Sequence, residues 1–238
     1  MRVLGIDTSG YANAVGVTDG GQVLADFTFE ARADSLQKIM ANIDSTLKSA
    51  RLTLEDIDGF GVGLGPGSWT GIRVGVTVAK ILAYCTSKPV AGVPTLEVLA
   101  YGTGSSETPV CAIISTGAGD TVYAAFYRTR NGEVARDGDY YVGDIAGLAR
   151  MVKEPTVLIG AEAMSYGELI CREGSLGSSI KAIEGVPRGA VVAILAARRL
   201  ERGESDDVLS LTPLYLKEST ARAFRNRYKV RAQSKGGD

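Results

Sequence analysis

The chain has 238 residues, enough for one large domain or two small ones with a substantial hydrophobic core. Its net charge of −1 excludes wholesale binding of nucleic acid or acidic membrane through the field of the whole molecule. Histidine is absent, which excludes Ser-His-Asp and Cys-His catalytic devices and every metal site that uses histidine. We therefore expect no metal centre, and chemistry only from carboxylates, lysine, tyrosine, hydroxyls, a bound nucleotide or a partner's residues.

Three cysteines, Cys85, Cys111 and Cys171, are isolated along the chain and odd in number. This usage is typical of buried thiols in a reducing compartment. No apolar run approaches the roughly 18 residues of a membrane span, and the N-terminus enters a strand pattern directly, without the pattern of a signal peptide. We expect a cytoplasmic protein with no membrane partner.

The first part of the chain predicts a three-strand antiparallel meander followed by alternating helices and strands. Asp19-Gly20-Gly21 supplies a turn within the meander. Asp34 and Gln37 lie in capping-box positions before a helix whose apolar residues repeat at helical spacing. Strands are predicted at Val3 to Ile6, Ala14 to Val17, Val23 to Phe29, Ile57 to Leu64 and Val90 to Val93, with helices from Asp34 to Leu47, Trp69 to Ser87 and Thr95 to Tyr101.

The stretch Gly102 to Pro109, GTGSSETP, is the best linker in the sequence. After it, the order of strand, glycine-bearing turn, strand, turn and strand recurs, with Asn131-Gly132 as a hairpin turn. By analogy of fold, this recurrence predicts the duplicated actin-like (ASKHA) α/β architecture, in which each domain opens with a three-strand meander followed by helix-strand units. The expected domains are residues 1–103 and a reduced second domain, 108–238, which ends in a helix at 187–202 and a basic tail. The other elements predicted in the second domain are strands at Val110 to Ser115, Val122 to Arg128, from Val134, and at Thr156 to Ile159, and helices at Ile145 to Val152 and Met164 to Arg172.

In actin-like proteins a carboxylate on the first hairpin approaches the metal and phosphates of a nucleotide. Asp7 in GIDTSG sits where such a residue would sit, and Thr8 and Ser9 could donate hydrogen bonds to phosphate. Asp7 and Thr8 are equally suited to capping their own turn. The turn from Thr116 to Asp120 could likewise present backbone N–H groups to an anion, or serve only as a turn.

Two features weigh against a small-molecule phosphotransferase, which is the alternative function. Ser115 stands where a second carboxylate would match Asp7, and VLIGAEA has only Gly160 where nucleotide-binding members carry a Gly-Gly pair. A peptidase ranks last, since the chain has no histidine and no nucleophile constellation. We expect the isolated chain to bind no cofactor and to have no turnover of its own.

The glycine-rich stretch GLGPGSWTGIRVG raises the question of a phosphate-binding loop. It is not a Walker A loop, because no lysine follows the glycines at the required place, and it does not fit the GxGxxG fingerprint. It is better interpreted as a helix entry with Ser68 as the N-cap. Small residues then recur every fourth position, which predicts close packing of one helix face against the protein's own sheet or against a partner. They are Gly67, Gly71, Gly75, Ala79 and Ala83.

Four motifs resemble the TsaB (YeaZ) family in order and spacing over the whole length of the chain: MRVLGIDTS, GPGSWTGIRVG, GVPTLEVLA, and TPLYLKE before a basic tail. The GPGS-aromatic-TG-apolar-R-apolar-G element is the most specific of them. In that family the protein is the dimerisation subunit of the bacterial machinery that makes threonylcarbamoyladenosine beside the tRNA anticodon. The resemblance implies a non-catalytic scaffold subunit that acts by binding the catalytic paralogue, TsaD, whose metal is held by histidines.

The resemblance implies further partners: a TsaE-like ATPase, a second copy of the chain when it is isolated, and tRNA through the complex. ATP or ADP could bind at the interface of that complex. The helix from Thr70 onward would form the surface that binds TsaD. The interface residues expected on this helix are Trp69, Gly71, Ile72, Arg73, Gly75, Val76, Ala79, Lys80 and Ala83.

Two departures from the family pattern concern its polar motifs. Asp34-Ser35 replaces a His-Ser pair, and Ser115-Thr116-Gly117 replaces an Asp-Ala-Arg motif, so the roles of those motifs do not carry over. The basic tail allows two hypotheses, contact with tRNA phosphates or a solvated end. Its candidate tRNA contacts are Arg222, Arg225, Arg227, Lys229 and Arg231.

Overall fold

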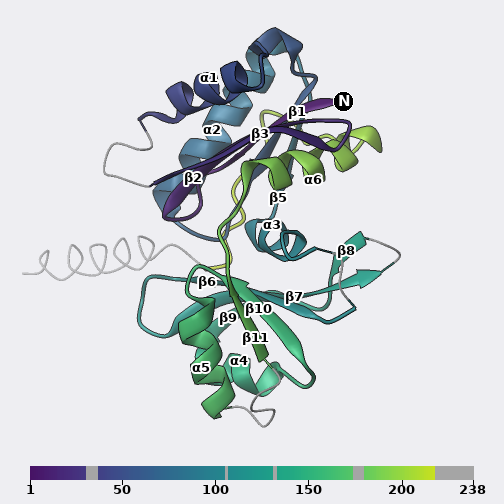
Figure 1. The fold of residues 1–238 in the computed structure, drawn as a ribbon. Helices are drawn as coiled ribbons and strands as arrows, with labels where there is room; N and C mark the ends of the chain where they lie inside the picture. Colours follow the sequence, from purple (N-terminus) through teal and green to yellow (C-terminus); the bar gives the residue numbers. More distant parts are fainter. Residues whose placement is uncertain (31–36, 105–106, 131–132, 174–179, 218–238) are drawn as a thin grey trace, which may run out of the picture.

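The computed structural model describes residues 1–30, 37–104, 107–130, 133–173 and 180–217. Two β-sheets lie one above the other, each flanked by helices, and α3 lies between them (Figure 1). The strands are β1 (Arg2–Asp7), β2 (Ala12–Asp19), β3 (Gln22–Glu30), β4 (Gly59–Gly63), β5 (Val90–Val93), β6 (Val110–Ser115), β7 (Thr121–Arg130), β8 (Glu133–Arg136), β9 (Tyr141–Asp144), β10 (Thr156–Gly160) and β11 (Ile180–Glu184). The helices are α1 (Ile39–Ser49), the 3-10 turn η1 (Leu54–Asp56), α2 (Trp69–Thr86), α3 (Thr95–Tyr101), α4 (Ile145–Met151), α5 (Ala163–Glu173) and α6 (Gly189–Glu201).

The first sheet has the strand order β3-β2-β1-β4-β5. β1, β2 and β3 form the predicted antiparallel meander, and β4 and β5 continue the sheet parallel to β1. α1 and α2 cover one face, where Ile43 and Ile72 join Leu4, Ile6 and other buried strand residues in one core. Alternate strand residues such as Leu4 and Ile6 point to this face, and they meet the helix residues there in a shared apolar layer.

The opposite face of the first sheet is covered by α6, whose backbone comes close to β1 and β2. A Cβ at Gly5 would lie 2.2 Å from the Gly189 carbonyl oxygen, and one at Gly16 would lie 2.1 Å from the Ala190 nitrogen. Ordinary contacts need about 3.5 Å, so neither strand position accepts a side chain unless the helix moves. The helix predicted at 187–202 as part of the second domain therefore packs on the first sheet.

The second sheet has the order β11-β10-β6-β7-β8, with β9 also paired to β7. β6, β7 and β8 form the second predicted meander, and β10 and β11 run parallel to β6. α4 and α5 share a core with one face, which includes Leu148 and Ile170. Leu96 and Leu99 of α3 pack on the other face, so a helix from the first half of the chain belongs to the core of the second sheet.

The remaining differences from the predicted elements are local. β9, β11 and η1 were not predicted, because each is only three to five residues long and gives little periodic signal in the sequence. The expected cap at Asp34 and the turn Asn131-Gly132 lie outside the described residues. Across the described residues, no helix is both long enough and apolar enough to cross a bilayer.

Candidate functional site

Asp7 lies at the end of β1, where its carboxylate is enclosed by the turn that follows. Oδ1 accepts hydrogen bonds from the Ser9 backbone N–H at 2.8 Å and from the Ser9 hydroxyl at 2.6 Å. Oδ2 accepts from the Thr95 hydroxyl at 2.9 Å, and that hydroxyl in turn accepts from the Gly65 N–H at 3.1 Å. The side chain is 0% exposed. Asp7 therefore caps its own turn and connects β1 to α3, which is the structural alternative that the sequence left open.

Burial is the dominant influence on the Asp7 carboxyl group. It raises the pKa above the ordinary value of 3.8, although the hydrogen bonds from Ser9 and Thr95 favour the charged form and oppose that rise. Thr8 is also buried, and its hydroxyl donates to the Gly71 carbonyl oxygen at 2.7 Å. Both side chains are thus used within the fold, and of the three predicted phosphate-binding residues only Ser9 lines the neighbouring cavity.

α2 begins against this hairpin, as predicted. The Ser68 side chain caps the helix by accepting from the Gly71 N–H at 3.3 Å, and the Ser68 N–H donates to the Ser9 carbonyl oxygen at 2.7 Å. A Cβ on Gly71 would lie 2.0 Å from the Thr8 carbonyl oxygen, and one on Gly75 would lie 2.3 Å from Thr8 Oγ1. The small residues of α2 therefore allow a close approach to the protein's own first hairpin.

This packing corrects the predicted partner interface. Six of its nine residues face the core of the first domain, because the small-residue stripe lies on the same side of α2 as the large apolar residues that the sheet needs. Trp69, Arg73 and Lys80 are the three at least partly on the surface. The six buried residues are Gly71, Ile72, Gly75, Val76, Ala79 and Ala83.

A different face of α2 is exposed and partly apolar. Ile81 is 56% exposed and Tyr84 is 69% exposed, and both line a shallow groove of about 240 Å³ with Cys85, Val208 and Leu209. At the start of the helix, the Arg73 guanidinium lies over the exposed Trp69 ring, with its central carbon 5.0 Å from the ring centroid. Ile81 and Tyr84 were not among the predicted interface residues, although their positions off the small-residue stripe indicate that they lie on another face of the helix.

The segment after α6 returns along α2 and completes this exposed face. Lys80 Nζ donates to the carbonyl oxygens of Leu209 and Leu211, both at 3.0 Å. Further on, the Tyr215 ring packs on Trp69 with centroids 4.4 Å apart. The exposed face of α2 is therefore built from helix and C-terminal segment together. Isolated exposed apolar residues are ordinary, whereas contiguous exposed apolar patches are typical of interaction sites.

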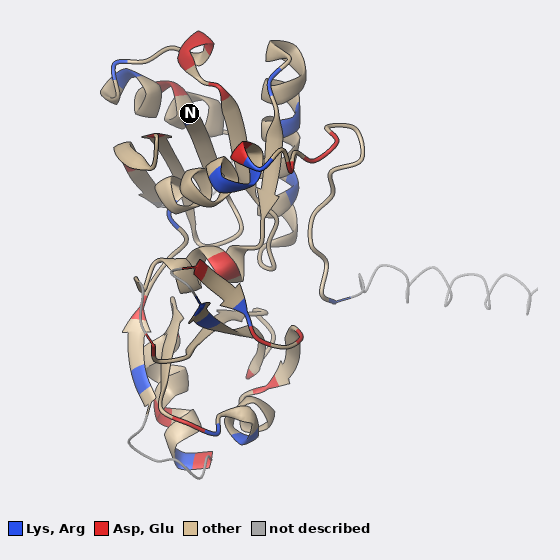
Figure 2. Ribbon diagram, turned by 90° about the vertical axis from the view of Figure 1, so that its right-hand side faces the viewer, with Lys and Arg blue, Asp and Glu red and all other residues tan. Residues whose placement is uncertain are grey.

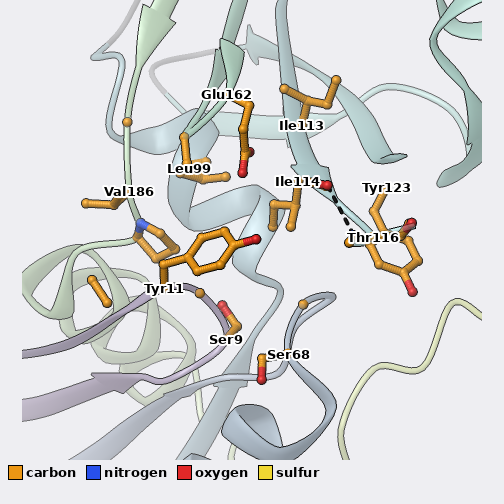
Figure 3. Close-up of a pocket in the computed structure, with 18 of the residues that line it drawn as sticks. Ser9, Tyr11, Ser68, Leu99, Ile113, Ile114, Thr116, Tyr123, Glu162 and Val186 are labelled. Atoms are coloured by element: carbon orange, nitrogen blue, oxygen red, sulfur yellow. Dashed lines mark hydrogen bonds between the residues drawn. The ribbon is translucent and has the colours of Figure 1, made fainter. Parts of the chain in front are cut away.

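A cavity of about 530 Å³ lies between the two sheets, at the end of α2 where the chain enters the helix. Its walls come from the first hairpin, the start of α2, α3, the second hairpin and the segments that follow β10 and β11. Figure 3 shows the Glu162 carboxylate and the Tyr11 ring pointing into the space from opposite sides. Hydroxyl groups at its edge come from Ser9, Ser68, Ser115, Thr116 and Tyr123.

The charge of this cavity argues against a polyphosphate ligand. Glu162 is the one carboxylate among its described lining residues, and none of these residues is lysine or arginine. Two backbone N–H groups of the second hairpin turn are also engaged within the turn and are not free for an anion. The Gly117 N–H donates to Ser115 Oγ at 3.1 Å, and the Ala118 N–H donates to Thr116 Oγ1 at 3.3 Å. The described residues therefore offer apolar walls, hydroxyls and a carboxylate, but no cation for phosphate.

The sequence predicted no metal site, and it gave tRNA contact through the basic tail as a hypothesis. Among the described residues, no group of three His, Cys, Asp or Glu side chains is placed to hold a metal ion. Lysines and arginines of the described chain are scattered over both halves among acidic residues (Figure 2). The tail residues predicted to contact tRNA, from Arg222 to Arg231, lie outside the described residues.

Comparison with known proteins places the chain in a family. The family described as "TsaD: tRNA N6-adenosine threonylcarbamoyltransferase" matches residues 29–155, more than half of the chain. The Bacillus subtilis (strain 168) tRNA threonylcarbamoyladenosine biosynthesis protein TsaB is 28% identical over 227 residues, which cover 94% of this chain and 97% of that protein. The protein of the same name from Escherichia coli (strain K12) is 35% identical over 134 residues, 56% of this chain and 58% of that protein.

Solved structures agree on the fold. YeaZ from Pseudomonas aeruginosa superposes with a TM-score of 0.77 at 24% identity, covering 90% of this chain and 99% of that one. The ROK hexokinase from Thermus thermophilus superposes with a TM-score of 0.54 at 14% identity, covering 84% of this chain and 100% of that one. The predicted actin-like architecture is thereby confirmed. The chain belongs to the family that the TsaD description defines and, within it, to the TsaB (YeaZ) group.

Proposed function

We propose that this chain is a non-catalytic subunit required for threonylcarbamoyl transfer to tRNA, and that it acts by binding a catalytic TsaD-like paralogue. The names of its relatives support a place in the synthesis of threonylcarbamoyladenosine. Two features of the chain support a non-catalytic role. The chain has no histidine, and the Asp7 carboxylate is already hydrogen-bonded to Ser9 and Thr95 within the fold. Reaction chemistry is accordingly assigned to the partner.

The observation that carries the proposal is the exposed face of α2, including Ile81 and Tyr84, with the C-terminal segment beside it. Burying such apolar side chains against a partner contributes about 25 cal/mol per Å² of apolar surface removed from water. Trp69 and Arg73 belong to residue types that dominate the energetics of many interfaces. We therefore place the partner surface on Trp69, Arg73, Lys80, Ile81 and Tyr84, in place of the buried small residues.

The proposal is tested by Ile81→Arg in the full chain, mixed with the TsaD-like protein of the same organism. Because Ile81 is more than half exposed, the change should leave the melting temperature of the isolated chain almost unchanged. It should abolish the complex in size-exclusion chromatography and the modification of tRNA in a reconstituted reaction. Met151→Arg is the matched control, since Met151 is 45% exposed on α4 of the second half.

Cys85 offers an independent measurement at the same surface, since it is exposed and lines the groove beside Ile81. Its alkylation should slow when the partner is added to the unmodified chain. A complex that forms equally well with Ile81→Arg, together with unchanged Cys85 alkylation, would place the interface elsewhere.

The alternative, a small-molecule phosphotransferase, has weaker support. The likeness to a hexokinase concerns the fold alone, and fold alone does not give function. A phosphoryl-transfer site needs cations to balance its ligand, and the described lining of the cavity has none. Steady ATP hydrolysis by the pure chain, lost in an Asp7→Ala variant that stays folded, would favour this alternative.

Several expectations about the assembly stay predictions. They are a homodimer of the isolated chain, a TsaE-like ATPase as a further partner, ATP or ADP at the complex interface, and tRNA contact through the tail. The tail is testable by ending the chain after Lys217. Log affinity falls as log salt rises, and each lost phosphate contact should make that negative slope shallower by about 0.7 to 0.9 in the full assembly.

A further inference from the structure

We propose that the cavity between the two sheets is a binding site for a small planar cation, an amidinium or guanidinium group on an apolar stem. The argument for this site does not use the partner surface on α2, although Trp69 belongs to that surface and also lines the cavity. It rests on the charge and shape of the cavity lining, which neither the proposed function nor the chemistry of a phosphate ligand uses.

The first observation is the state of Glu162. It is half-buried, directly precedes α5, and its carboxylate points into the cavity (Figure 3). Within the described part of the chain, no side-chain hydrogen bond or ion pair engages this carboxylate, although its backbone carbonyl accepts from the Tyr166 N–H at 3.0 Å. A carboxylate that is partly withdrawn from water and has no cation beside it favours a ligand that brings one.

The second observation is what surrounds that carboxylate. Leu99, Ile114 and Val186 give the cavity an apolar wall near Glu162, and the Tyr11 ring faces it from the first hairpin (Figure 3). An aromatic face attracts a cation, and apolar walls stabilise a bound ligand with a hydrophobic stem because its apolar surface is removed from water. Near Glu162 the pocket thus combines a carboxylate, the Tyr11 ring and an apolar wall.

These features select a planar cation over an ammonium group. A carboxylate accepts two parallel N–H bonds from an amidinium or guanidinium, which fixes the plane of the ligand. Such a group is more weakly hydrated than an ammonium, so it loses less when it enters an apolar pocket. It also stacks on a tyrosine ring, which an ammonium cannot do. The ring of hydroxyls at the edge could satisfy its outward N–H groups.

Trp69 provides the readout, because it lines the cavity and is the one tryptophan in the sequence. The full chain is titrated with benzamidine, with its neutral counterpart benzamide and with the anionic benzoate, and tryptophan emission is recorded. We expect saturable binding in the order benzamidine, benzamide, benzoate. Glu162→Gln should weaken benzamidine binding about tenfold and leave benzamide almost unchanged, as expected for loss of one charge-assisted pair.

Glu168→Gln is the matched control, since Glu168 is an exposed carboxylate on α5, and it should leave every titration unchanged. Melting curves of both variants confirm that the fold is intact. A second arm uses N-acetyl-arginine amide, which distinguishes a free aromatic amidine from the arginine side chain of a polypeptide as the natural source. Glu162-dependent binding in either arm supports the site. Equal binding of benzoate and benzamidine, binding that Glu162→Gln leaves unchanged, or no saturable response in either arm overturns it.

Discussion

Gly71→Ala tests whether the small residues of α2 are needed for packing within the chain. The new Cβ would lie 2.0 Å from the Thr8 carbonyl oxygen, so helix and hairpin must separate by about 1.5 Å to restore an ordinary contact. The separation also strains the 2.7 Å hydrogen bond from the Thr8 hydroxyl to the Gly71 carbonyl oxygen.

The opposing contributions can be compared. Overpacking costs about 1–3 kcal/mol, and leaving a buried hydroxyl without its partner costs about 1–3 kcal/mol. Alanine in a helix gains about 1 kcal/mol over glycine. The expected net loss is about 1–5 kcal/mol, against the roughly 5–15 kcal/mol that stabilises a typical domain. For a chain of this length it corresponds to a fall in melting temperature of about 2–20 °C.

The assay is urea denaturation and thermal melting of the purified chain, with Thr77→Ala as the control on the same helix. Thr77 lies on the exposed face of α2, so alanine there should leave stability unchanged or raise it by a few tenths of a kcal/mol. Opposite signs for the same new residue would separate packing from helix propensity. If Gly71→Ala is as stable as the wild type, the close approach to Thr8 is not a constraint.

Three further predictions concern other buried groups. Ala79→Arg should unfold the chain or lower its stability by several kcal/mol, because Ala79 is 0% exposed and an unpaired charge would enter the core; normal melting with lost assembly would refute this. The pKa of Asp7 is raised in the folded state, so the folded protein takes up a proton at a higher pH than the unfolded chain. Lowering the pH through the folded-state pKa should therefore increase the stability of the wild type relative to Asp7→Asn, until the unfolded chain is also protonated below about 3.8. Urea titrations across the acidic range check the sign, and a stability of the wild type that falls relative to Asp7→Asn on acidification would contradict it. Burial raises the pKa of the Cys111 thiol to about 12, so iodoacetamide at neutral pH should modify the exposed Cys85 and reach Cys111 only after unfolding; mass spectrometry of the native protein that finds both modified equally would contradict its burial.

The sequence by itself determined most of the helices and strands, together with the caps and turns that bound them. The Ser68 cap, the strand meanders on each side of the linker and the close packing of α2 all follow from short-range patterns, in which each residue's role depends on neighbours a few positions away. The absence of histidine likewise limits the available chemistry without any structure. The family resemblance rested on the same kind of local motif.

Only the tertiary structure decided which surfaces these elements share. The stripe of small residues on α2 predicts that another part of the protein or of a partner packs closely against the helix, but it does not say which part. In the structure that neighbour is Thr8, 63 positions before Gly71. α6 packs on the first sheet because Gly5 and Gly16 leave room for its backbone. Whether Asp7 is free and Glu162 is unpaired depends on side chains brought together from distant parts of the chain. Such pairings arise from the packing of whole elements, and periodicity within one element carries no information about them.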